Sequence, residues 1–151
     1  MNKITGFLDG LDLSKLVPEL AELLGKVKSV AGWAVFLCPM LVLTLGVIYF
    51  FKPPKEANHG FGFRTYFGMG SIQAWRYTQR FAGLVYMGVG SILTIVMGII
   101  CLTFGGKDAA LVLDRAVKCL IWEIVLIFAA WLTVVIHIAL RYDKDGNRRK
   151  K

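Results

Sequence analysis

The sequence predicts an all-α integral membrane protein with three transmembrane helices, an N-terminal amphipathic helix and a short cytoplasmic interfacial helix. Hydrophobic residues make up 56% of the 151 residues, and the mean hydropathy is positive, unlike in an ordinary soluble domain. Three apolar stretches, 30–51, 84–104 and 119–140, are each close to the roughly 20 residues that a helix needs to cross a hydrocarbon core. We therefore expect a single membrane domain over residues 30–140.

Residues 1–29 contain a helical pattern of their own. Apolar residues recur at three- and four-residue steps from Leu13 to Val27, with charged residues between them. This pattern predicts an amphipathic helix that lies on the bilayer surface or on a partner helix. The first apolar run is about 22 residues long, whereas a signal-peptide core has about 7 to 15. We therefore expect the first span to stay as an anchor.

The second span contains small residues at a regular spacing. Gly90, Thr94 and Gly98 are four residues apart, which places them on one helix face where another helix can approach closely. This stripe predicts helix packing against the first and third spans. A substrate groove and homo-oligomerisation through the same stripe are the weaker interpretations.

The third span contains two ionisable residues, Glu123 and His137. Ionisable residues inside a membrane are costly and often functional. Their separation of about 21 Å along a helix excludes a shared metal ion or a direct proton transfer. Two interpretations stay open: ordinary residues at the membrane boundary, or a gate, ligand or proton site. The three cysteines have no metal-binding spacing, and we expect small core residues with neither a metal nor a cofactor.

The basic residues predict the orientation of the chain. Most of the 18 lysines and arginines lie in the first loop or in the tail 141–151, and these segments share a side in a three-span protein. The positive-inside rule then places the first loop and the C-terminus in the cytoplasm, with the protein in the cell membrane. This distribution argues against nucleic-acid binding. The polar tail is expected to be disordered, and its basic end suits anionic lipid.

The loop 60–83 between the first two spans is rich in glycine, arginine and aromatic residues. Ser71 is placed to cap a short helix that carries Trp75, Arg76 and Arg80, rides the membrane surface and enters the bilayer near Gly83. The glycine spacing fits neither a P-loop nor a dinucleotide site, so nucleotide binding is not expected.

This loop also carries a family signature. The run Gly62-Phe63-Arg64-Thr65, then Met69, then Trp75, and finally Gln79 to Gly83 resembles the signature of the SdpI family of small bacterial membrane proteins. The resemblance covers roughly residues 41–104. The sequence departs from the family pattern at several positions: Gly68 stands where Ser is common, Thr78 where Ala is common and Gln79 where Asn is common. In addition, Tyr66-Phe67 replaces a pair that commonly contains Pro or Arg.

The resemblance implies a non-enzymatic membrane protein that gives immunity to, or senses, a secreted antimicrobial peptide. Its implied partners are a peptide toxin, a cytoplasmic regulator in signal transduction and membrane lipids. For Arg64 and Trp75, a structural role and a contact with a partner or lipid both stay open. The alternative function is a small transporter or lipid-handling subunit that uses Glu123 and the glycine-lined second span. An enzyme ranks third, because the sequence contains no recognisable catalytic set.

Overall fold

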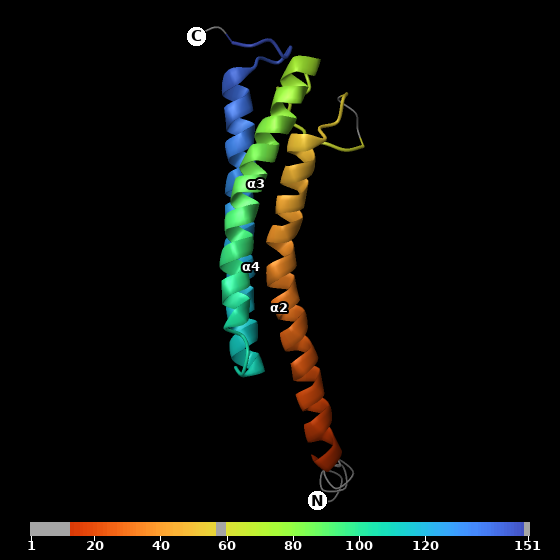
Figure 1. The fold of residues 1–151 in the computed structure, drawn as a ribbon, viewed down its shortest axis with the longest axis vertical. Helices are drawn as coiled ribbons and strands as arrows, with labels where there is room; N and C mark the ends of the chain where they lie inside the picture. The colour runs from red at the N-terminus through yellow and green to blue at the C-terminus, as the bar shows by residue number, and fades with distance from the viewer. Residues whose placement is uncertain (1–12, 57–59, 150–151) are drawn as a thin grey trace, which may run out of the picture.

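The computed structural model describes residues 13–56 and 60–149 of the chain. This part contains three helices, α2 (Leu13–Phe51), α3 (Ile72–Leu102) and α4 (Ala109–Arg141). They pack side by side as an antiparallel bundle, with α3 running against α2 and α4 (Figure 1). All three are long and apolar enough to cross a membrane, which confirms the predicted all-helical chain with three membrane-capable helices.

Helix α2 differs from the prediction of a separate N-terminal helix. Residues 13–51 form one uninterrupted helix, and residues 1–12 lie outside the described part. The N-terminal part of α2 projects beyond the ends of α3 and α4 (Figure 1), so its large apolar side chains are exposed. Their exposure leaves this apolar surface of α2 available to lipid. The exposed side chains are those of Leu20, Leu23, Leu24, Val27 and Val30.

Helix α3 joins the predicted interfacial helix to the second span without a break. Ser71 caps it as predicted, since its hydroxyl oxygen accepts a hydrogen bond from the Ala74 amide at 3.1 Å. Gly83 lies inside α3, where its missing side chain lets the backbone of α2 approach closely.

Close backbone packing joins α2 to α3. A Cβ atom added at Gly83 would lie 2.6 Å from the amide nitrogen of Phe50, and one at Gly90 would lie 2.6 Å from that of Leu43. Gly46 faces the α3 backbone in the same way. At Gly90, the stripe of small residues is therefore in direct contact with the backbone of α2. Thr94 donates a hydrogen bond to the Gly90 carbonyl of its own helix, and Gly98 faces the ring of Phe36.

The buried core divides into two clusters, one toward each end of the bundle. One consists of Ala31, Val35, Leu93, Met97, Phe104, Val112 and Ala116. The other joins the ends of the helices to the first loop and the start of the tail and consists of Tyr49, Phe63, Ala74, Ala82, Val134, Ile138 and Tyr142. Many other large apolar side chains face outward, as expected for helices surrounded by lipid.

The tail is folded where the prediction had disorder. Tyr142 and Arg148 form an antiparallel bridge, and the Asp143 carboxylate accepts hydrogen bonds from the amides of Asp145 and Asn147. Gly146 provides the left-handed backbone conformation of the turn, with a φ of 74°. The prediction of disorder is therefore wrong for residues 142–149, while residues 150–151 lie outside the described part.

Candidate functional site

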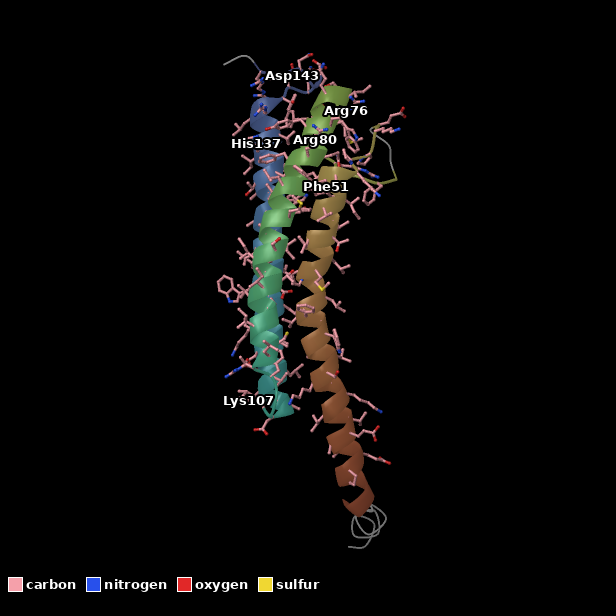
Figure 2. All side chains as sticks on the ribbon, viewed as in Figure 1. Phe51, Arg76, Arg80, Lys107, His137 and Asp143 are labelled. Atoms are coloured by element: carbon pink, nitrogen blue, oxygen red, sulfur yellow. The ribbon has the colours of Figure 1, made fainter. Side chains whose placement is uncertain are left out.

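The candidate site lies at one end of the bundle, where the loop 60–71, the first turns of α3 and the tail 142–149 meet. Figure 2 shows Phe51, Arg76, Arg80, His137 and Asp143 at this end and Lys107 at the opposite end. The site contains all of the signature residues named above except Gly83, which lies further along α3. We call this set of segments the braced loop.

Gln79 holds the loop to α3 through two hydrogen bonds to one residue. Its side-chain oxygen accepts from the Phe63 amide at 2.8 Å, and its side-chain nitrogen donates to the Phe63 carbonyl at 2.8 Å. The Gln79 side chain is fully buried, so these bonds satisfy backbone groups that water does not reach. The Gln79 side-chain amide therefore bonds both backbone groups of Phe63, as the backbone of a neighbouring β-strand would.

Trp75 fills the space beneath the same loop. Its indole is fully buried, and its Nε1 donates a hydrogen bond to the Pro54 carbonyl at 2.9 Å, which ties the end of α2 to α3. Gly62, with a φ of 131°, lies so close that an added Cβ atom would be 2.7 Å from the indole ring. The Trp75 ring therefore packs inside the protein and is not exposed to lipid headgroups.

Thr65 closes a turn of the loop against α3. Its hydroxyl oxygen accepts a hydrogen bond from the Gly68 amide at 2.9 Å, and its carbonyl accepts one from the Met69 amide at 3.2 Å. A Cβ atom added at Gly68 would lie 2.5 Å from the hydroxyl oxygens of both Thr65 and Thr78. The Thr65 and Thr78 side chains therefore leave no room for any residue larger than glycine at position 68.

Three arginines of the loop 60–71 and of α3 are exposed. Arg64 is exposed, although it belongs to the same signature as the buried Phe63 and Thr65, and it interacts electrostatically with Tyr49 of α2. Arg76 and Arg80 are exposed one turn apart on α3. The loop thus presents three guanidinium groups, which can form paired hydrogen bonds with phosphate or carboxylate groups.

The tail docks on the loop, a contact that the sequence analysis missed. The Ser71 hydroxyl donates a hydrogen bond to the Gly146 carbonyl at 2.8 Å, and Gly70 and Gly146 meet backbone to backbone. Arg149 donates to the Tyr142 carbonyl at 3.1 Å and lies over the Phe67 ring, 5.9 Å from its centre. The run Asp143-Lys-Asp-Gly-Asn is a turn sequence that could have indicated a folded tail.

His137 belongs to an aromatic cluster between α3 and α4. Its Nε2 is 3.0 Å from the Tyr77 hydroxyl oxygen, and its ring stacks on Phe81 with centroids 4.0 Å apart. The Arg141 guanidinium lies 4.3 Å from the centre of the Tyr77 ring, a cation–π contact. His137 therefore packs α4 against α3 near one end of the bundle.

Glu123 lies far from this end and is fully buried in the bundle. The Cys38 thiol approaches its carboxyl group, yet within the described part of the chain no hydrogen bond of acceptable geometry reaches either oxygen atom. Cys101 and Cys119 also interact with it electrostatically, so each helix contributes one thiol. The carboxyl group of Glu123 lies about 20 Å along α4 from the start of the helix at Ala109, inside the bundle.

Metal binding gains no support from this arrangement. Within residues 13–56 and 60–149, no group of three histidine, cysteine, aspartate or glutamate side chains could hold a metal ion. The described residues instead provide a buried carboxyl group within the bundle and exposed guanidinium groups at one end of it.

A model of the SdpI/YfhL protein family matches residues 55–140, from the segment that follows α2 through the loop and α3 to the last turn of α4. Neither a curated protein nor a solved structure matches the chain. Since the family model spans more than half of the sequence, this multi-pass membrane protein belongs to the SdpI/YfhL family.

Proposed function

We propose that this member of the SdpI/YfhL family is a non-enzymatic protein of the bacterial cell membrane that protects against, or senses, a secreted antimicrobial peptide. The observation that carries this proposal is the family match over residues 55–140. The exposed apolar surface of the bundle supports it, because a membrane-active peptide meets the protein within the bilayer.

The proposed mechanism divides the work between the helices and the braced loop. The lipid-facing sides of the helices contact the peptide and keep it from assembling in the membrane. The loop, held rigid by Gln79 and Trp75, presents Arg64 to lipid phosphates or to a cytoplasmic regulator. In this proposal the braced loop and tail face the cytoplasm, as the distribution of basic residues predicts.

The test is survival of a sensitive Gram-positive host that expresses the chain and is challenged with a panel of membrane-active peptides. We expect protection by the native chain and a loss of protection by Arg64→Ala. Arg115→Ala is the matched control, because Arg115 is also an exposed arginine but lies near the start of α4, at the opposite end. Fusion reporters after Lys151 must show that all three proteins insert equally.

One outcome contradicts the proposed function, and a second contradicts the proposed role of Arg64. If the native chain protects against no peptide of the panel, the immunity function fails. If Arg64→Ala protects as well as Arg115→Ala, the immunity function stands but the exposed arginine of the signature has no part in it.

A second candidate function rests on Glu123. A fully buried carboxyl group without a hydrogen-bond partner in the described residues is costly to maintain, which favours a role in a transport or lipid-handling path. The close packing of Gly83 and Gly90 against α2 argues against an open path along that part of the glycine stripe. Substrate flux into vesicles is the test, with Glu123→Gln expected to abolish it. Equal flux in Glu123→Gln and the native chain contradicts the transport role.

A further inference from the structure

A cavity of about 440 Å³ lies between α2 and α3 at the end opposite the braced loop. Its walls are almost entirely apolar, and it opens to the side of the bundle. Its lining includes Gly32 and Phe36 of α2, Gly98 and Cys101 of α3, and Phe104 just after α3. Its volume falls in the range typical of sites for small ligands.

Gly98 explains why the cavity is open here. The same stripe that brings Gly90 against the backbone of α2 continues to Gly98, but at this level the ring of Phe36 stands 3.5 Å from where a Cβ atom would be. The helices are therefore held apart by an aromatic side chain instead of meeting backbone to backbone. An apolar space results within the lipid-facing wall of the bundle.

Lys28 is the one charged residue among those that line the cavity. Its Nζ donates a hydrogen bond to the Lys107 carbonyl at 2.8 Å, which holds the ammonium group at the polar end of the cavity and leaves its other donors available. Lys26 and Lys118 differ, since each forms an ion pair with an acidic residue one turn earlier on its own helix. Among the described residues, Lys28 has no acidic partner.

The cavity is therefore amphipathic along the helix axis. From Lys28 to Phe36 is about 12 Å along α2, with a cation at one end and carbon atoms over the rest. Trp33, on its wall, is 62% exposed and sits close to the start of the apolar stretch, where tryptophan marks the edge of the hydrocarbon core. A ligand that matches this shape has an apolar chain, an anionic head and access from within the bilayer.

We propose that this cavity binds one acyl chain of an anionic phospholipid, with its phosphate group on the Lys28 ammonium. Charge complementarity favours an anionic over a zwitterionic head, since one lysine near a membrane surface contributes about 1 kcal/mol, equivalent to about fivefold in affinity. The site lies at the end opposite the braced loop and does not depend on the proposed immunity function.

Native mass spectrometry of the full chain in detergent tests this site, with phosphatidylglycerol and phosphatidylcholine titrated separately. The native chain is expected to retain one phosphatidylglycerol molecule with an affinity about fivefold above that for phosphatidylcholine. Gly98→Leu fills the cavity and should abolish this retention. Lys28→Gln should keep binding but remove the preference between the two head groups.

The chain offers a matched control for each variant. Gly88→Leu also adds a leucine to α3, at a position where an added Cβ atom has nothing within 4 Å. Lys26→Gln removes a neighbouring lysine charge that does not line the cavity. Both controls should bind phosphatidylglycerol as the native chain does.

Three results would overturn the assignment. The first is equal affinity of the native chain for the two lipids, and the second is native-like retention by Gly98→Leu. The third is a loss of preference in Lys26→Gln as large as in Lys28→Gln, which would mean that net charge alone attracts the lipid. If Gly98→Leu does not fold, the comparison of Lys28→Gln with Lys26→Gln still decides.

Discussion

Gln79 and Phe63 are joined by two hydrogen bonds of 2.8 Å, in which a buried side-chain amide pairs with both backbone groups of a loop residue. The pairing fixes the loop to α3 sixteen residues further along the chain. It also explains how an irregular segment can lie against a membrane-spanning helix, because its backbone groups find partners that neither lipid nor water supplies there.

Loss of this pairing should destabilise the protein. We expect Gln79→Met to lower the free energy of unfolding by about 1–3 kcal/mol, since the Phe63 amide and carbonyl would stay buried without partners. The midpoint of thermal unfolding in detergent measures the effect. Gln73→Met is the control, because Gln73 is exposed on the same helix. Equal midpoints for the two variants would contradict a bracing role for Gln79.

Gly68 and Thr78 should behave as a coupled pair. Gly68→Ser places a Cβ atom against the Thr78 hydroxyl, and we expect a loss of about 1–3 kcal/mol in unfolding free energy from overpacking. Thr78→Ala removes that clash, so the double variant should regain part of the loss. The double variant should not regain all of the lost stability, because the new side chain at position 68 still clashes with the Thr65 hydroxyl.

A double-mutant cycle of unfolding free energies measures the coupling between positions 68 and 78. A coupling energy within about 0.5 kcal/mol of zero would show that the two positions act independently. A clear coupling would explain two departures from the family pattern together, because the family often has Ser and Ala at these positions.

The docked tail depends on the backbone of Gly146. Gly146→Ala adds a Cβ atom where the backbone of Gly70 and Ser71 lies and strains a φ of 74°, so we expect the tail to detach from the loop. The measurement is the rate of trypsin cleavage after Arg148 and Arg149, which should rise. Gly106→Ala is the control, because Gly106 has a φ of 67° but nothing within 4 Å of an added Cβ atom. An unchanged rate in Gly146→Ala would argue against docking.

The buried carboxyl group of Glu123 should lower the free energy of unfolding of the bundle. We expect Glu123→Leu to raise the free energy of unfolding by about 1–3 kcal/mol, because it removes a buried polar group whose oxygens have no partner in the described residues. Thermal unfolding in detergent measures the change, and Glu22→Leu, at an exposed position of α2, should stay within about 0.5 kcal/mol. A loss of stability in Glu123→Leu would show that the carboxyl group is a structural brace.

The sequence analysis was most accurate where a pattern depends on neighbours in the chain. The three apolar stretches and the Ser71 cap were predicted correctly, because hydrophobic length and capping act over a few residues. The family signature was also recognised, and the family model confirms it. Boundaries between helices were predicted less well. The sequence has no strong breaker between residues 19 and 38 or between Ser71 and Leu102, so the surface helices continue into the spans.

The sequence by itself determined that this chain is a three-span membrane protein of the SdpI type, because apolar length and the spacing of the signature are properties of the chain alone. Only the tertiary structure decided what the signature residues do. Trp75 and Gln79 face inward because the loop folds back onto α3, whereas Arg64 remains exposed. Contacts between residues far apart in the chain also decide which helix faces meet. These contacts determine the docking of the tail, the burial of Glu123 and the cavity next to Lys28.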